Sequence, residues 1–161
     1  MTTSNVLFIM SDEHSRRVLG AYGNRVVHTP HMDALAAAGT LFESAYCNCP
    51  ICVPSRASFA TGQYVHEIGF WDNGIPYHGD PASFGHRLHD CGQRCDSIGK
   101  LHYRAAEDPN GFDNEILPLH VLNGIGDLQG MLRSPPPRRP STAQLAADAG
   151  EGDSTYLQYD R

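Results

Sequence analysis

Lysine is almost absent from this sequence, and so is any surplus of positive charge. Lys100 is the only lysine among 12 lysine and arginine residues, and 18 acidic residues give a formal net charge of −6. Proteins that bind nucleic acid usually present a basic surface, so this balance argues against a nucleic-acid partner. The lone lysine either marks a position that requires a compact point charge or is a chance feature of the composition.

Long apolar segments are missing as well. No run approaches the roughly 20 apolar residues that cross a bilayer as a helix, so we expect no membrane partner. The first five residues lack a positive region before the apolar stretch 6–10, and we therefore expect no signal peptide. The cysteines number five, which is odd and fits a reducing compartment better than a disulfide framework. We accordingly expect a cytoplasmic protein.

Short apolar runs alternate with helix signals along the first part of the chain. The 161 residues suit one domain with a real core. Helices are predicted from Pro30 to Gly39, after Cys52 and over residues 81–90. Strands are predicted over residues 6–10, 40–46 and 94–98. This alternation predicts an α/β fold with a doubly wound, mostly parallel sheet and flanking helices.

The second part of the chain gives a weaker signal. A proline-rich stretch, 134–140, is followed by a segment of small and polar residues without a clear apolar face. We therefore divide the chain into residues 1–117, which carry the α/β pattern, and residues 118–161, which we expect to form an irregular loop or tail.

Polar clusters follow the predicted strands. Ligands bind beyond the carboxyl ends of strands in open α/β sheets, where the ends of parallel strands meet. We therefore expect the clusters to converge at one rim of the sheet. They are Asp12-Glu13, the segment from Cys52 to Arg56, and the segment from Lys100 to His102.

The segment around Cys52 has the features of an anion site. Pro54 is typical of a helix start, and the first N–H groups of a helix attract anions. Arg56, one helical turn later, adds a planar cation that suits tetrahedral oxyanions. Two other interpretations stay open. Cys52 can be an inert core residue, or it can join a zinc site or disulfide with the other cysteines, Cys47, Cys49, Cys91 and Cys95.

The motif Cys52-Val53-Pro54-Ser55-Arg56 resembles the signature of the type I sulfatases, in the alkaline phosphatase superfamily. In that family the cysteine is oxidised after translation to formylglycine, which is the catalytic nucleophile. The resemblance implies an alkaline-phosphatase-like fold, a small-molecule sulfate ester as substrate, and the formylglycine-generating enzyme as a partner. It implies that Arg56 is catalytic beside the nucleophile.

The same resemblance implies further site residues. Lys100-Leu101-His102 resembles the Lys-x-His element whose side chains contact the sulfate ester, which makes Lys100 and His102 catalytic candidates. Asn73 corresponds to an asparagine that lines the active site in the choline-sulfatase and phosphonate-monoesterase branch, and we expect it to bind substrate.

A divalent cation is also implied, with calcium first and manganese or magnesium as alternatives. Its ligands here would be Asp12, the formylglycine from Cys52, and Glu13 if that longer carboxylate reaches the ion. The family usually has a second aspartate at the position of Glu13, so this residue is a departure from the pattern.

The resemblance covers residues 5 to about 115, whereas sulfatases are considerably longer and take further metal ligands from their C-terminal part. We therefore expect a truncated gene product, a fragment, or a piece of a larger assembly that needs its missing part or a second copy. Two alternatives are retained. One is a phosphonate or phosphate ester hydrolase on the same scaffold, and the other is a non-catalytic module, vestigial or stabilised by zinc.

Overall fold

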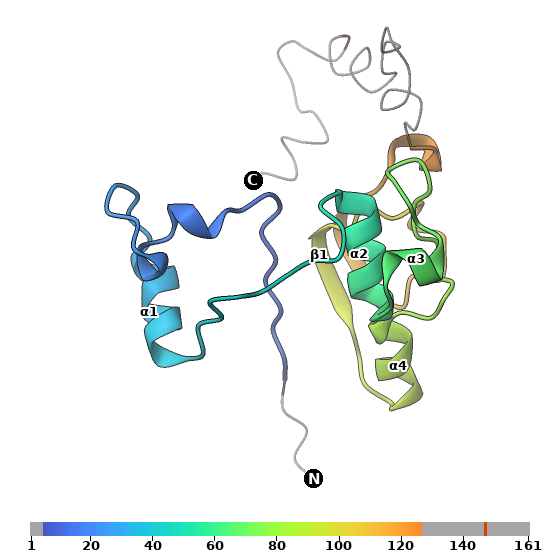
Figure 1. The fold of residues 1–161 in the computed structure, drawn as a ribbon. Coiled ribbons are helices and arrows are strands. Elements are labelled where there is room, and N and C mark those ends of the chain that lie inside the picture. The colour runs from blue at the N-terminus through green and yellow to red at the C-terminus, as the bar shows by residue number, and fades with distance from the viewer. Residues whose placement is uncertain (1–4, 127–146, 148–161) are drawn as a thin grey trace, which may run out of the picture. The chain divides into compact units, whose positions relative to one another are not determined.

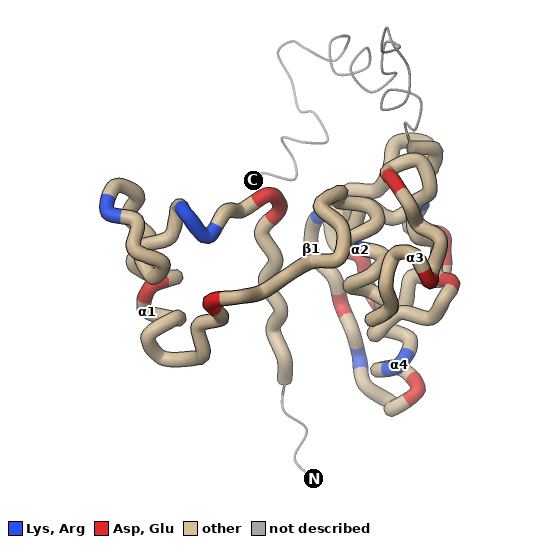
Figure 2. The backbone as a smooth tube through the Cα atoms, in the orientation of Figure 1, with Lys and Arg blue, Asp and Glu red and all other residues tan. Residues whose placement is uncertain are grey.

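The computed structural model describes residues 5–126 and Ala147, and the chain divides into two compact units, residues 1–46 and residues 47–161 (Figure 1). Acidic and basic residues are interspersed along both units (Figure 2). None of the helices in the described ranges has the length and apolar character of a membrane-spanning segment. The predicted irregular segment 118–161 lies outside the described residues except for 118–126 and Ala147.

One helix organises the first unit. As predicted, α1 (Pro30–Ala38) begins at a proline, whose missing N–H costs nothing in the first turn, and ends at Gly39. The Asp33 carboxylate accepts hydrogen bonds from the Ala21 N–H at 2.7 Å and the Thr29 hydroxyl at 3.0 Å. These bonds connect α1 to the preceding loop. That loop contains two short 3-10 helices, η1 (Arg16–Val18) and η2 (Gly20–Tyr22).

Two of the predicted strands are wrong. Residues 6–10 and 40–46 form no strand, and Val6, Leu7 and Ile9 are 90%, 84% and 80% exposed. A strand is held by hydrogen bonds to a neighbouring strand. In the described part of the chain, neither segment pairs with another strand. The apolar pattern predicted that these side chains are buried in a sheet. In the structure they are exposed instead.

In its described residues up to 126, the second unit holds the sheet and three α-helices. The helix predicted after Cys52 is confirmed. The helix predicted over 81–90 begins later, because Ser83 accepts a hydrogen bond from the backbone N–H of His86 and caps it. The third predicted strand is confirmed with a shift of two residues. The elements are α2 (Cys52–Thr61), α3 (Val65–Ile68), α4 (Phe84–Asp90), β1 (Asp96–Lys100), β2 (Asn114–Leu119) and the 3-10 helix η3 (Leu122–Gly124).

In the described residues the sheet consists of β1 and β2, which pair in parallel with Ile98 opposite Ile116. The doubly wound sheet that we predicted is thus represented by one parallel pair. The register is irregular before Lys100, where Leu117 has a φ of +48° and Pro118 lacks an N–H. We did not predict β2. It contains Pro118, and a proline is typical of an edge strand or of no strand.

The core of the second unit is built from aromatic rings on a small-residue face of α2. Ala57 and Ala60 are buried, and the rings of Phe70, Tyr77 and Tyr103 pack against them. Tyr77 and Tyr103 meet edge to face, with ring centroids 4.9 Å apart, which is a favourable aromatic geometry. Burial also raises the pKa of Tyr103. The core therefore holds the chain directly after His102.

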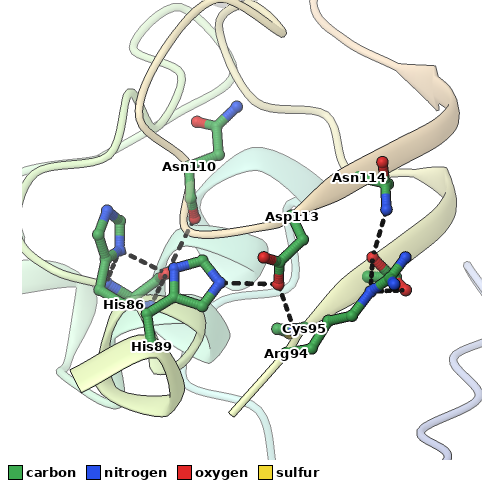
Figure 3. Close-up of polar contacts among 9 residues, drawn as sticks. His86, His89, Arg94, Cys95, Asn110, Asp113 and Asn114 are labelled. Carbon is green, nitrogen blue, oxygen red and sulfur yellow. Dashed lines mark hydrogen bonds and ion pairs between the residues drawn. The ribbon is translucent and has the colours of Figure 1, made fainter. Parts of the chain in front are cut away.

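A carboxylate connects α4 to both strands (Figure 3). Asp113 Oδ2 accepts a hydrogen bond from the Cys95 N–H at 2.7 Å and lies 2.9 Å from His89 Nε2. The Asp113 N–H donates in return to the Cys95 carbonyl at 2.7 Å. The Cys95 N–H and, next, the His89 ring lower the pKa of Asp113, so its ionised form is favoured in the folded chain.

We predict that Asp113→Asn weakens the acid dependence of stability. Because the folded pKa lies below the unfolded value of about 3.9, the stabilisation is present above about pH 4 and is lost as the pH falls through the folded pKa. Urea unfolding of the 161-residue chain between about pH 3 and pH 6 measures this effect.

Asp90→Asn is the matched control, since Asp90 is exposed and lies 3.7 Å from Arg87. This change should leave the loss of stability on acidification close to that of the wild type. If Asp113→Asn and the wild type lose stability in parallel on acidification, the stabilising role of Asp113 is wrong.

Candidate functional site

The site begins at the first turn of α2. Cys52 is the first helical residue and is partly buried, while Val53 and Pro54 are fully buried behind it. Ile51 precedes the helix and has no side-chain polar atom with which to cap it. Regular helical bonding starts with the Ser55 N–H, which donates to the Ile51 carbonyl at 3.0 Å. The first donors of α2 therefore need partners from elsewhere.

Asn73 provides one such partner. Its Oδ1 accepts a hydrogen bond from the Val53 N–H at 3.1 Å and lies 3.7 Å from the Cys52 Sγ, whose thiol donates to it. The turn that carries Asn73 is closed by a hydrogen bond from the Gly74 N–H to Asp72 Oδ1 at 2.6 Å. The predicted substrate-binding residue thus lies beside the predicted nucleophile.

Arg56 connects α2 to the end of β1. Cys52 and Arg56 are four residues apart and so share one face of the helix. The Arg56 guanidinium donates to the Lys100 carbonyl oxygen at 2.5 Å. The strand end and the helix start are thereby joined through a contact between residues 44 positions apart.

The segment from Lys100 to His102 is held by its backbone. The His102 N–H donates to the Leu119 carbonyl at 2.7 Å, and His102 has a φ of +58°. Lys100 and His102 are partly buried. The second unit therefore brings the segments that carry Cys52, Arg56, Asn73, Lys100 and His102 into one region.

Asp12 and Glu13 belong to the first unit. They form an exposed turn after residues 6–10, with Glu13 at a φ of +54°. Their approach to Cys52, and their role as metal ligands, stay predictions.

The described residues do not form a complete metal site. Calcium takes six to eight oxygen ligands, yet within residues 5–126 no group of three or more His, Cys, Asp or Glu side chains is arranged to hold an ion. The zinc-stabilised alternative finds no support in this region for the same reason. The disulfide alternative is wrong, since all five cysteines are free thiols.

Sequence reasoning missed a polar cluster next to the end of β1. Glu115 Oε2 lies 2.8 Å from His120 Nε2, and Glu115 Oε1 accepts a hydrogen bond from Asn110 Nδ2 at 2.9 Å. His120 follows Leu119, whose carbonyl accepts a hydrogen bond from the His102 N–H. It precedes Val121, whose N–H donates to the Tyr103 carbonyl. No motif in the sequence signals this cluster.

Comparisons with known proteins identify the family. Residues 4–116, more than half of the chain, match the Sulfatase family. This chain belongs to the sulfatase family. The sulfatase chain is 36% identical over 110 residues to the N-acetylglucosamine-6-O-sulfatase of Bacteroides thetaiotaomicron, a match that covers 68% of this chain and 19% of that protein. It is 30% identical over 118 residues to the choline-sulfatase of Rhizobium meliloti, covering 72% and 23%.

A solved structure supports a sulfatase-like fold. It is a protein in complex with its substrate, D-glucosamine-2-N,6-O-disulfate, and it matches with a TM-score of 0.63 and 34% identity over 69% of this chain and 22% of that one. The sulfatase chain spans about a fifth of the length of the curated relatives that it matches. The helices and the parallel strand pair are consistent with a truncated α/β domain.

We predict that Arg56→Ala lowers the free energy of unfolding of this sulfatase chain by about 1–2 kcal/mol. The change removes a charged donor from the Lys100 carbonyl, and such bonds contribute roughly 1.5–3 kcal/mol when well buried. Arg56→Lys should recover only part of the loss, because an ammonium group lacks the planar reach of a guanidinium. Urea denaturation measures both variants.

Arg87→Ala serves as the matched control. Arg87 pairs with Asp90 on the surface, and its loss should cost less than about 1 kcal/mol. Equal unfolding midpoints for Arg56→Ala and Arg87→Ala would show that the Arg56 contact does not stabilise the fold.

Proposed function

We propose that this chain carries the nucleophile-bearing part of a sulfuric ester hydrolase that acts on a small sulfate ester. The observation that supports this proposal best is the arrangement around the start of α2. The modifiable Cys52 lies at a helix N-terminus, Asn73 contacts it, and Arg56 connects the same helix face to Lys100.

Each residue has a proposed role. The formylglycine-generating enzyme, using an external oxidant, converts the Cys52 thiol to an aldehyde. One hydroxyl of the hydrated aldehyde attacks sulfur while the S–O bond to the alcohol breaks, and the second hydroxyl then loses its proton and expels sulfate, which restores the aldehyde. The N-terminus of α2 and the Arg56 guanidinium favour negative charge at position 52. Lys100 stabilises the sulfate oxygens, and His102 donates a proton to the leaving oxygen. Asn73 contributes to substrate binding.

Membership of the sulfatase family also supports a divalent cation as cofactor. Calcium is the first choice, with manganese or magnesium as alternatives, and Asp12, Glu13 and position 52 are this chain's candidate ligands. Because the described residues do not complete such a site, the roles above are assigned to the chain's own side chains alone.

The substrate is proposed as a class. The similar proteins are named for sulfate esters of an amino sugar and of choline, which supports a small sulfated molecule without selecting its alcohol. Sulfate release from a sugar 6-sulfate, choline sulfate and an aryl sulfate should be compared with hydrolysis of a phosphonate monoester. Faster hydrolysis of the phosphonate would favour the alternative reaction class.

We predict that Cys52 is converted to formylglycine when the chain is co-expressed with the formylglycine-generating enzyme, because the motif from Cys52 to Arg56 is intact. Mass spectrometry of the peptide over residues 47–56 detects the conversion, and the peptide with Cys91 should remain unmodified. Only unmodified Cys52 in that sample would remove the proposed nucleophile.

We also predict that the converted chain 1–161 hydrolyses an aryl sulfate feebly or not at all. The reason is the incomplete ligand set in its described residues, since loss of even one preorganised electrostatic group costs about a hundredfold or more in rate. Residual activity should disappear in Cys52→Ala. Robust metal-dependent turnover by the wild type, absent in Cys52→Ala, would contradict this prediction and show a sufficient site.

A further inference from the structure

We propose that Asn73 is a positioning residue that caps α2 from a distant turn and fixes the direction of the side chain at position 52. Its Oδ1 accepts a hydrogen bond from the helix. Its Nδ2 is then the group that can donate a hydrogen bond to the substrate. The second statement rests on the proposed function, whereas the first depends only on the fold.

The need for a cap follows from the sequence at the helix start. The first N–H groups of a helix have no partner within it. Ser, Thr, Asp or Asn normally supplies a side-chain oxygen just before the helix, but Ile51 occupies that position. Pro54 has no N–H to satisfy. Val53 is only 1% exposed, so water has little access to its N–H, and an unpaired buried donor is costly.

Asn73 meets this need across 20 residues of sequence. Its Oδ1 lies 3.1 Å from the Val53 nitrogen, a normal hydrogen-bond distance. The same oxygen lies 3.7 Å from the Cys52 Sγ, within reach of a thiol donor. One acceptor atom therefore binds both the helix end and the side chain of residue 52. Any hydroxyl-bearing side chain at position 52 has a donor for the same oxygen.

The contact with Val53 also fixes which way the amide faces. A backbone N–H only donates, so the atom opposite it must be the amide oxygen. The Asn73 Nδ2 consequently points away from the Val53 N–H. A sulfate oxygen only accepts hydrogen bonds, and Nδ2 is a donor of the matching kind. Asn73 can thus cap the helix and bind substrate at the same time, with different atoms.

The turn that carries Asn73 is supported on two sides. Asp72 Oδ1 closes it by accepting from the Gly74 N–H at 2.6 Å. Gly126 approaches its backbone so closely that an added Cβ would overlap the Asn73 carbonyl oxygen. Such support restricts the turn, and a restricted turn can hold an acceptor at a fixed place.

Two substitutions in the 161-residue chain separate the roles. Asn73→Ala removes both the acceptor and the donor, whereas Asn73→Asp keeps an acceptor oxygen and removes the donor. We expect amide hydrogen exchange at Val53 to be about tenfold faster in Asn73→Ala, in line with the loss of a helix cap. We expect Asn73→Asp to retain the wild-type protection.

Thr61→Ala is the control on the same helix. It removes the hydrogen bond from the Thr61 hydroxyl to the Ala57 carbonyl and should leave the exchange at Val53 unchanged. If Asn73→Ala leaves Val53 as protected as in the wild type, or if Asn73→Asp exposes it equally, the capping role is overturned.

Inorganic sulfate tests the donor half of the proposal. Sulfate titrated into the wild type should shift the resonances of Val53 and Asn73, and both Asn73 variants should bind at least about tenfold more weakly. Wild-type sulfate binding by Asn73→Asp would overturn the donor role. No sulfate binding by the wild type would count against the donor role and the proposed function together, and the exchange at Val53 would still decide the capping role.

Discussion

The start of α2 imposes the constraint on which the second unit depends. Val53 and Pro54 in its first turn are buried, and the preceding residue Ile51 cannot cap it. Burial of α2 on the aromatic core therefore requires an acceptor from another part of the chain, and Asn73 supplies it. The residue next to that acceptor is Cys52. The same acceptor, Asn73 Oδ1, therefore stabilises the end of the helix and contacts the side chain of Cys52.

A second set of contacts fixes the position of the chain at the end of β1. Tyr103 lies in the core, the backbone of His102 bonds to β2, and the Lys100 carbonyl accepts from Arg56. On the side of the strand end, each of these contacts uses the backbone or a core ring. Side chains that act on a substrate can be carried by a segment whose position is secured by other groups.

Local signals account for what the sequence predicted correctly. Proline and glycine mark the ends of α1, and the Cys52 motif marks the start of α2. The errors arose where structure depends on distant partners. Residues 6–10 have the composition of a buried strand, but composition does not supply a neighbour. The Asn73 contact with Val53 joins residues 20 positions apart, so spacing along the chain could not reveal it.

The two units carry groups of opposite character. The second unit supplies a helix N-terminus, a guanidinium and an ammonium group, all of which favour an anion. The first unit supplies the carboxylates of Asp12 and Glu13. If these carboxylates join the site, as the resemblance predicts, their charge opposes a sulfate ester, and a bound cation would be needed to offset it. The groups that favour an anion are organised within the second unit, and a requirement for a cation would arise only with the carboxylates.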